Sequence, residues 1–153
     1  MGGCICATRT AAASRRGTSP DCIFCRIVER SADALLIHED DRTISFLALE
    51  PAISGHTVLA PKAHYADVYT IPEDLLSDLM KSCQSHARRW REQVGASGIN
   101  ILHASGLDAD QSVGHCHFHL FPRFARDGIR AWPTLARPAQ TREEMHAVFR
   151  LDA

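Results

Sequence analysis

The most regular hydrophobic pattern in the chain is a strict alternation around residue 118. Residues 115–120 read His-Cys-His-Phe-His-Leu, so histidines alternate with apolar side chains. A period of two is typical of a half-buried strand, and we expect a strand over 115–121 that Pro122 ends. The three imidazoles would then share one face, about 6.6 Å apart along a strand that rises about 3.3 Å per residue. Three imidazoles on one face indicate a functional site and not part of the hydrophobic core.

Four other short apolar runs, bounded by turn-forming residues, predict further strands. They cover residues 35–38, 43–47, 57–60 and 99–102. The first two are joined by a turn at Glu39-Asp40-Asp41, and we expect them to form a hairpin.

Apolar residues at three- and four-residue spacing predict one long helix in the middle of the chain. We expect it to begin at a capping box, Thr70 to Glu73, and to end at Gly95. Its expected apolar positions are Leu76, Met80, Cys83, Ala87, Trp90 and Val94.

Two shorter helices are expected on either side of these elements. One runs from about residue 20 to 29 with Asp21 as its N-cap, and the other starts at a capping box, Thr141 to Glu144. The order is then helix, strands, helix, strands, helix around a mostly antiparallel sheet, which indicates an α+β fold.

Composition narrows the class of protein without changing this picture. The 153 residues amount to one domain, with 45% hydrophobic and 23% charged residues as in ordinary soluble proteins. Residues 1–20 contain three arginines and no acidic residue, and we expect a disordered tail there and a single domain over 21–153. A net charge of −1 gives no electrostatic case for nucleic acid, and no apolar run approaches the roughly 20 residues of a transmembrane helix.

The cysteines bear on the compartment and on metal chemistry. The chain has six cysteines without a secretory signal, so we expect free thiols in a reducing compartment, the cytoplasm. Cys22 and Cys25 form a Cys-x-x-Cys pair, which in such a chain indicates zinc or redox chemistry. The structural alternative is that both thiols are small core side chains.

The residues alone leave two chemical interpretations of the histidine row open. One is a three-histidine metal site, and the other is a nucleophilic histidine flanked by helpers. The segment 115–121 also fits the signature His-X-His-X-His-X-X with X apolar, and residues 21–25, 51–64, 98–100 and 111–113 add matches in consistent order. The chain therefore resembles the histidine-triad (HIT) nucleotide hydrolases and transferases.

The resemblance implies a fold, a partner and a substrate class. The fold is a five-stranded, mostly antiparallel sheet with a long helix across it and a C-terminal helix. HIT proteins commonly pair as homodimers and act on purine nucleotides. Relatives that transfer nucleotides are generally longer and carry a shorter His-x-His motif, so the full triad favours hydrolysis over transfer.

The resemblance also implies a structural zinc ion. In many relatives a Cys-x-x-Cys pair, the histidine of a Pro-Lys-x-His run and the first histidine of the triad hold Zn²⁺. Here these residues are Cys22, Cys25, His64 and His115. A zinc held in this way would leave the second histidine of the triad free for chemistry.

For the reaction, the resemblance assigns the nucleophile to His117, which would attack the α-phosphate and form a nucleotidyl-histidine. His119 and Ser112 match positions that contact the phosphate and the leaving group. Gln111 matches a position on the phosphate side, and Asn100 is a candidate polar contact there.

The nucleoside would occupy an apolar slot, and here the chain departs from the family pattern. The family's base-pocket positions correspond to Ile23, Phe24, Ile27 and Phe46. Many relatives have an aspartate two residues after the phenylalanine of this strand, which binds the ribose hydroxyls, whereas this chain has Ala48. Glu50 is the candidate to take over that role, and Ser105 stands where asparagine is frequent.

The leading hypothesis is thus hydrolysis at the α-phosphate of a nucleoside phosphoramidate, a nucleotidyl adduct or a dinucleoside polyphosphate. A nucleotidyltransferase is the enzymatic alternative. A zinc-stabilised nucleotide-binding module with little turnover is the alternative from another class, because the ribose aspartate is missing. A three-histidine metal hydrolase is disfavoured, because the cysteine pair offers zinc a better site.

Overall fold

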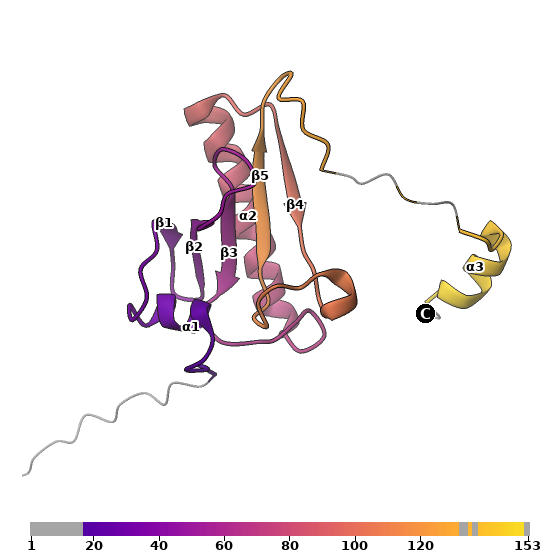
Figure 1. Cartoon of the computed structure of the whole chain (residues 1–153), viewed down its shortest axis with the longest axis horizontal. Coiled ribbons are helices and arrows are strands. Elements are labelled where there is room, and N and C mark those ends of the chain that lie inside the picture. The colour runs from indigo at the N-terminus through magenta and orange to yellow at the C-terminus, as the bar shows by residue number, and fades with distance from the viewer. Residues whose placement is uncertain (1–16, 132–134, 136–137, 152–153) are drawn as a thin grey trace, which may run out of the picture.

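The computed structural model describes residues 17–131, 135 and 138–151. One five-stranded sheet with the order β1-β2-β3-β5-β4 organises the molecule, and every neighbouring pair is antiparallel (Figure 1). The elements are α1 (Ile23–Val28), β1 (Leu36–Glu39), β2 (Thr43–Leu47), β3 (Thr57–Pro61), α2 (Glu73–Val94), β4 (Gly98–Leu102), a 3-10 turn (Leu107–Ala109), β5 (Phe118–Arg123) and α3 (Arg142–Phe149). The predicted α+β fold is confirmed.

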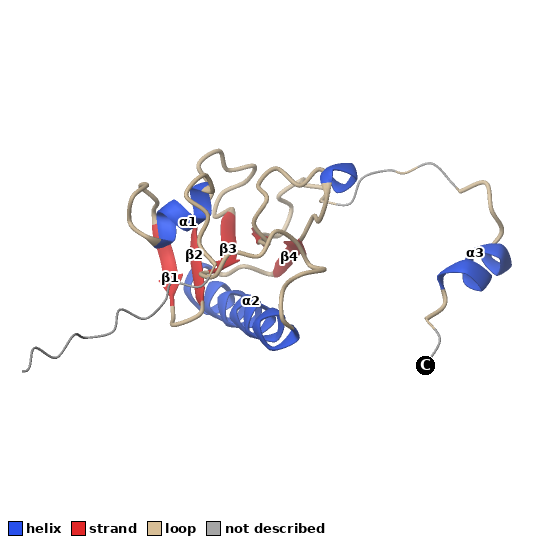
Figure 2. Ribbon diagram, turned by 90° about the horizontal axis from the view of Figure 1, so that it is seen from below, coloured by secondary structure: helices blue, strands red, loops and turns tan. Residues whose placement is uncertain are grey.

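The sheet separates two apolar clusters, and α1 and α2 cover its opposite faces (Figure 2). Alternate residues of each strand supply the two faces, as the period of two requires. The α2 face holds Leu59, Leu75, Leu79, Cys83, Cys116, Phe118 and Leu120, with Ile71 beside them. The α1 face holds Phe24, Ile27, Ile44, Phe46, Val58 and Ala60.

The predicted strand over 115–121 is wrong in its bounds, because the observed strand begins at Phe118. Residues 115–117 precede it and use their backbone elsewhere. The Cys116 amide donates to the Tyr65 carbonyl at 2.6 Å, and the carbonyls of His115 and His117 accept from imidazoles at 2.6 and 2.7 Å. These bonds replace the ladder that a strand would need.

Pro122 does not end the strand as predicted, since β5 continues to Arg123 and Pro122 pairs with Ile99 of β4. The missing amide is tolerated because pairing with β3 has already stopped at Leu120. Gly55 makes room for the ring, since a Cβ there would lie 2.8 Å from Pro122 Cγ. Its φ of +78° also favours glycine.

The long helix has the predicted end but not the predicted start. Gly95 adopts a left-handed conformation at the C-cap, with a φ of 69°. The capping box at residue 70 is not formed, because Pro72 is the N-cap and the Thr70 hydroxyl donates to Asp67 at 2.9 Å. The Asp67 carboxylate thus organises the turn before the helix in place of the expected cap.

The buried face of α2 keeps part of the predicted one, since Cys83 is buried and Leu76 and Trp90 pack against the same cluster, but its centre is rotated. Its buried residues are Leu75, Leu79, Ser82, Cys83 and His86. Met80 and Val94, expected in the core, are 45% and 57% exposed. The difference arises from His86, which is buried because its Nδ1 donates to the Ser82 carbonyl at 2.8 Å and its Nε2 accepts from the Ser45 hydroxyl at 2.9 Å.

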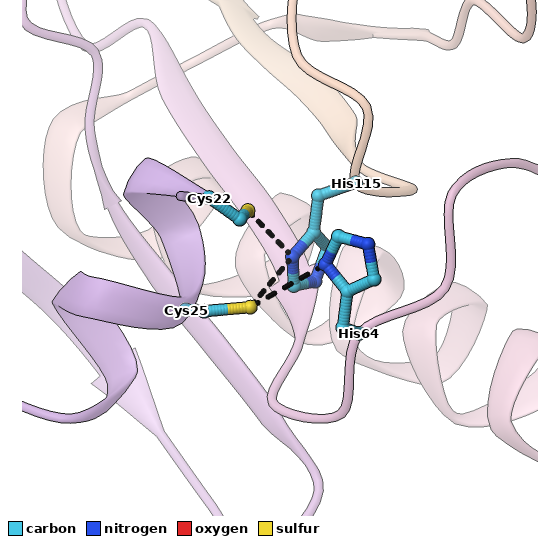
Figure 3. A group of neighbouring side chains, drawn as sticks. All are labelled: Cys22, Cys25, His64 and His115. Atoms are coloured by element: carbon cyan, nitrogen blue, oxygen red, sulfur yellow. Dashed lines mark hydrogen bonds between the residues drawn. The ribbon is translucent and has the colours of Figure 1, made fainter. Parts of the chain in front are cut away.

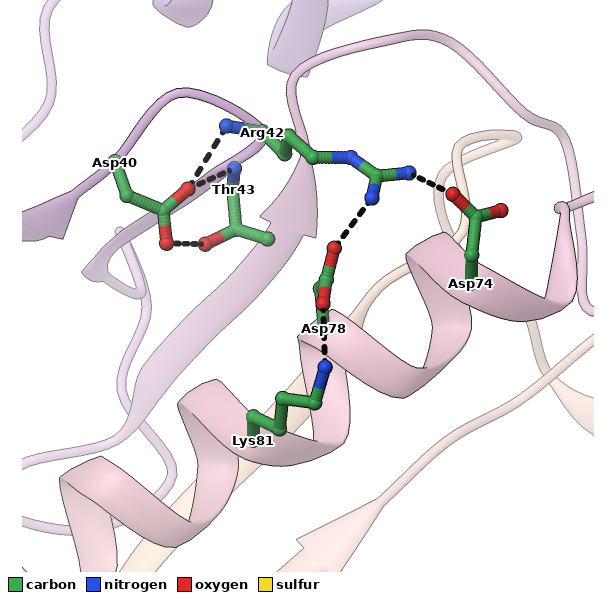
Figure 4. A network of polar contacts seen from close by, with 6 residues as sticks. All are labelled: Asp40, Arg42, Thr43, Asp74, Asp78 and Lys81. Atoms are coloured by element: carbon green, nitrogen blue, oxygen red, sulfur yellow. Dashed lines mark hydrogen bonds and ion pairs between the residues drawn. The ribbon is translucent and has the colours of Figure 1, made fainter.

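The turn between β1 and β2 is fastened to α2 by charged side chains (Figure 4). The Asp40 carboxylate accepts from the Arg42 and Thr43 amides at 2.8 and 2.7 Å, which closes the turn. The Arg42 guanidinium then reaches Asp74 at 2.7 Å and Asp78 at 2.5 Å on the helix. The hairpin therefore has one fixed position on the helix.

The two short helices differ in how they begin. Asp21 is not the N-cap of α1, because Cys22 occupies that position without a side-chain cap. The capping box of α3 is confirmed, with reciprocal bonds between Thr141 and Glu144. This helix lies apart from the sheet in both views (Figures 1 and 2).

Residues 17–20, expected in the disordered tail, are hydrogen bonded to the domain. The Gly17 carbonyl accepts from the His64 amide at 2.5 Å, and the Ser19 amide donates to Cys25 Sγ at 3.3 Å. Residues 1–16, the rest of that predicted tail, lie outside the described residues. Within the part of the chain that is described, none of the helices is long and apolar enough to cross a membrane.

We predict that Leu79→Ala destabilises the fold far more than Met80→Ala. Leu79 is fully buried in the α2 face, and its truncation should cost about 2–5 kcal/mol of unfolding free energy. Met80 is 45% exposed, and its truncation should cost roughly 0.5 kcal/mol or less. Urea unfolding of both variants measures the difference, and equal losses would contradict the observed rotation of the helix.

Candidate active site and metal centre

Two thiols and two imidazoles meet between α1 and the segment before β5 (Figure 3). Cys22 and Cys25 come from the start of α1, His64 from the chain after β3, and His115 from just before β5. Their ligand atoms all lie within 4.8 Å of one another. The structure thus brings together the whole predicted metal set, and these residues could hold a metal ion.

The spacing of the ligand atoms fits a tetrahedral ion. Zinc with thiolate bonds near 2.3 Å and imidazole bonds near 2.0–2.1 Å separates sulfur from nitrogen by roughly 3.6 Å. The Nδ1 atom of His115 lies 3.3 Å from Cys22 Sγ and 3.7 Å from Cys25 Sγ. Cys25 Sγ lies 3.4 Å from His64 Nδ1. Three of the four sulfur–nitrogen pairs thus have distances that suit tetrahedral zinc, and two thiolates with two imidazoles are a typical structural zinc set.

Neighbouring groups orient the cluster and favour neutral ligands. The Nε2–H of His115 donates to the Pro61 carbonyl at 2.9 Å, which leaves the Nδ1 lone pair facing the thiols. Burial lowers the pKa of His115 to about 4 and raises the pKa of Cys25. The imidazole is therefore a ready ligand, whereas the Cys25 thiol needs the positive charge of a metal to ionise.

The second histidine of the triad has its attacking atom defined by its neighbour. His117 is buried, and its Nδ1–H donates to the His115 carbonyl at 2.6 Å. Nε2 therefore carries the lone pair. Burial lowers the pKa of His117, which keeps the ring neutral, and the Phe24 ring meets it edge-on at 5.1 Å. A neutral imidazole with a free Nε2 is a competent nucleophile.

The third histidine is held as a hydrogen-bond donor. The Ala52 amide donates to His56 Nδ1 at 3.1 Å, so the proton of His56 lies on Nε2. That Nε2–H donates to His119 Nδ1 at 2.8 Å, which leaves the proton of His119 on its own Nε2. Burial lowers the pKa of His119 to about 4. His117 and His119, with ring centroids 4.8 Å apart, thus present an acceptor and a donor side by side.

Comparison with known proteins now identifies the family. The HIT domain model matches residues 29–126. The chain belongs to the HIT domain family. A HIT-like protein of Methanocaldococcus jannaschii is 36% identical over 107 residues, which cover 70% of this chain and 82% of that protein. Adenosine 5′-monophosphoramidase HNT1 of Saccharomyces cerevisiae is 34% identical over 114 residues, 73% of this chain and 70% of that protein.

A solved relative agrees in fold. The structure of a Zn-bound histidine triad family protein from Mycobacterium smegmatis aligns with a TM-score of 0.70 at 34% identity. The alignment covers 81% of this chain and 86% of that one. The predicted HIT fold and family are both confirmed.

The other polar residues expected in the HIT site have different surroundings. Ser112 is exposed in the loop before His115. The Gln111 side chain is engaged within the chain, because its amide donates to the Ala66 and Val113 carbonyls at 2.6 and 2.9 Å and its oxygen accepts from the Gly106 amide at 2.7 Å. The Gln111 backbone amide is also engaged, since it donates to the Gly106 carbonyl at 3.2 Å, so a phosphate contact from Gln111 would have to replace one of these bonds.

Asn100 faces a salt-bridged turn. Its Oδ1 accepts from the Arg123 guanidinium at 2.5 Å, and the same guanidinium contacts both carboxylate oxygens of Asp127 at 2.7 Å. The guanidinium holds the pKa of the Asp127 carboxyl far below its usual range. Asn100 of β4 therefore helps to hold the Arg123 side chain, which joins the end of β5 to the turn that follows it.

Three of the expected base-pocket residues are part of the core on the α1 face. Phe24, Ile27 and Phe46 are buried, with exposures of 7%, 6% and 4%, whereas Ile23 is 40% exposed. Ala48 packs against the same cluster. Glu50 is exposed two residues further along.

Sequence reasoning missed His103 as a neighbour of the triad. Its Nδ1–H donates to the His117 carbonyl at 2.7 Å, and its ring packs on Phe118 with centroids 4.8 Å apart. The available signal was a histidine directly after a predicted strand that runs beside the triad strand.

Proposed function

We propose that this HIT protein hydrolyses nucleotides at the α-phosphate through a covalent nucleotidyl-His117 intermediate. The hydrogen bond from His117 Nδ1 to the His115 carbonyl carries the proposal, because it directs the Nε2 lone pair away from the backbone. Similarity to a yeast protein named as an adenosine 5′-monophosphoramidase supports a nucleoside phosphoramidate as substrate. Nucleotidyl adducts and dinucleoside polyphosphates are further candidates of the same class.

The reaction proceeds in two displacements. His117 Nε2 attacks the α-phosphorus, a nitrogen–phosphorus bond forms, and the bond from phosphorus to the leaving group breaks. The leaving group takes the electron pair and a proton from solvent. Water then attacks the same phosphorus, gives up a proton to solvent, releases the nucleoside monophosphate and returns the electron pair to Nε2. In this proposal Ser112 contacts the leaving group, with Gln111 and Asn100 on the phosphate side.

His119 supplies a donor for the charged phosphoryl oxygens. Its Nε2–H is available because His56 occupies Nδ1 at 2.8 Å. A donor fixed before substrate arrives stabilises developing charge without reorganising. His56 therefore acts through His119, as a positioning residue.

We predict that His117→Ala lowers the rate at which adenosine monophosphate is released from adenosine 5′-phosphoramidate by about 1,000-fold or more, because the nucleophile is lost. His38→Ala, which removes an exposed histidine on β1, should leave the rate unchanged. Coupled detection of the monophosphate measures both. Retention of a tenth of the activity by His117→Ala would contradict the assignment. Failure of the wild type on phosphoramidates and dinucleoside polyphosphates, with nucleotide still bound, would favour the binding-module alternative.

We propose that the Cys22, Cys25, His64 and His115 cluster holds a structural Zn²⁺. Three of its four sulfur–nitrogen distances, 3.3–3.7 Å, support the proposal, as does similarity to a protein described as Zn-bound. When bound, the ion would ionise the thiols and tie α1 to the segment that carries the triad. Because all four ligands come from the protein, the ion would leave no open position for substrate.

We predict about one zinc per chain in protein purified without added metal, and loss of that zinc in Cys25→Ala. Removal of the ion should lower the unfolding temperature, since metal binding contributes directly to folding. Cys83→Ala, which removes a buried thiol of α2 outside the cluster, should keep the metal. Mass spectrometry of metal content and thermal unfolding test this. A metal-free wild type as stable as one supplied with zinc would contradict it.

We propose that Glu50 binds the ribose hydroxyls in place of the aspartate that many HIT proteins carry at position 48. Ala48 offers no acceptor and packs against the apolar cluster. Glu50 is the next residue of the same parity and is exposed, so its carboxylate is free to meet a ligand from solvent. Ile23, Phe24, Ile27 and Phe46 would then lie toward the base.

We predict that Glu50→Ala raises KM for adenosine 5′-phosphoramidate by about tenfold, the usual effect of losing a hydrogen bond to a charged group. The 2′,3′-dideoxy substrate should be insensitive to the change, and Glu143→Ala on α3 should be silent with both. Steady-state kinetics with the two substrates decide. An equal change in KM for both substrates would show that Glu50 does not bind the ribose hydroxyls.

We further propose that the protein is a homodimer, as its family resemblance implies. β4 is the last strand of the sheet and leaves one edge of the ladder open. Ile101 on this strand is 37% exposed. An apolar residue on an open edge suits pairing with a second copy.

A further inference from the structure

A chain of three hydrogen bonds outside the triad ends on the backbone of His117. The Val68 amide donates to Ser105 Oγ at 2.9 Å. Ser105 Oγ lies 2.7 Å from His103 Nε2, and His103 Nδ1 lies 2.7 Å from the His117 carbonyl oxygen. Val68 comes from the segment before α2, whereas the other three residues lie in the β4–β5 connection.

The chemistry of these groups permits one arrangement of protons when His103 is neutral. A carbonyl oxygen only accepts, so His103 Nδ1 carries a hydrogen. Nε2 then accepts, and the Ser105 hydroxyl must donate to it. The Val68 amide in turn donates to the lone pair of that hydroxyl. Each of these polar groups has a partner in the series of hydrogen bonds, and this fixes the tautomer and the angle of the His103 ring.

The carbonyl that His103 holds has no ladder partner. Pairing between β4 and β5 ends at Leu102 and His119, and pairing between β3 and β5 ends at Leu59 and Phe118. His117 lies just before both ends and is buried. A buried carbonyl requires a donor, and an imidazole supplies it here in place of a strand amide.

We propose that His103 is a positioning residue for the nucleophile, an inference that rests on the proposed function of His117. By holding the His117 carbonyl, His103 fixes the peptide plane from which the His117 side chain projects. The His115 carbonyl fixes the far end of the same side chain at Nδ1. With both ends held, Nε2 keeps one direction toward the phosphate.

The segment after His64, a proposed metal ligand, is hydrogen bonded to the same part of the chain that carries His117. The Tyr65 carbonyl accepts from the Cys116 amide at 2.6 Å, and the Ala66 carbonyl accepts from the Gln111 side chain at 2.6 Å. Val68 continues this series to Ser105. Three bonds thus join residues 65–68 to the segment that carries the nucleophile, and the bond through His103 completes the series at His117.

Isosteric substitutions separate the two ring nitrogens of His103. Asparagine places an amide nitrogen where Nδ1 lies and keeps a donor for the His117 carbonyl. Glutamine places its amide nearer the position of Nε2 and keeps the contact with Ser105. Phenylalanine keeps the packing on Phe118 and removes both polar atoms.

We expect His103→Asn to keep kcat on adenosine 5′-phosphoramidate within about threefold of wild type. His103→Gln and His103→Phe should lower kcat by roughly 10- to 100-fold while KM changes little, as for loss of alignment in the attacking step. Single-turnover formation of the nucleotidyl-enzyme should fall by the same factor. Ser105→Ala removes the partner of His103 Nε2 but keeps the Nδ1 donor, so the kcat of this variant should lie between these limits.

Two results would overturn the proposal. One is equal kcat in the Asn, Gln and Phe variants, whether all are active or all lose activity together with thermal stability. The other is the absence, in the wild type, of an NMR scalar coupling across the hydrogen bond from labelled His103 Nδ1 to the His117 carbonyl carbon. This coupling needs no turnover, so it separates failure of the positioning role from failure of the proposed hydrolysis, which an inactive wild type would show.

Discussion

His115 is the residue on which both centres of this protein depend. Its Nε2–H donates to the Pro61 carbonyl, its Nδ1 faces the thiols of Cys22 and Cys25, and its own carbonyl accepts from His117. The residue is fully buried, so rotating its ring would leave polar groups unpaired away from water. The orientation of a candidate metal ligand and the orientation of the proposed nucleophile are therefore one constraint. This explains why the row of histidines is packed more tightly than a surface site would be.

The same constraint explains why the strand starts late. In a strand the carbonyls accept hydrogen bonds from the amides of neighbouring strands, whereas the carbonyls of His115 and His117 accept from imidazoles. Two rings thereby gain fixed tautomers, and the ladder loses three residues at its beginning. The lost pairing is compensated from outside the sheet, by the Tyr65 carbonyl and by His103. A regular strand through the whole triad would satisfy the backbone equally well, but it would leave the rings free to rotate.

Much of the fold could be predicted from the sequence, because local chemistry decides it. The bounds of β2 follow from its apolar run, and Gly95 and the Thr141 box end and begin helices as their residue types require. The prediction at Thr70 is wrong because Asp67 competes for the Thr70 hydroxyl, and the prediction at Asp21 is wrong because α1 begins one residue later, with Cys22 as its N-cap. The face of α2 was misplaced because periodicity counts apolar residues, whereas His86 is buried through its bonds to Ser45 and the Ser82 carbonyl.

Part of the candidate site could likewise be predicted from the sequence, and part could not. Its candidate metal set was predictable because two cysteines and two histidines at family spacing leave few alternatives, and the structure brings them together. The surroundings of Gln111 and His103 were not predictable, because both side chains bind backbone groups far along the chain, and a carbonyl has no signature in a sequence. A motif therefore names the reacting side chains but not the groups that aim them. In this protein those groups are a carbonyl, that of His115, and two imidazoles, those of His56 and His103, so under the proposed positioning role a substitution at His103 would leave the HIT signature unchanged while altering the direction of the proposed nucleophile.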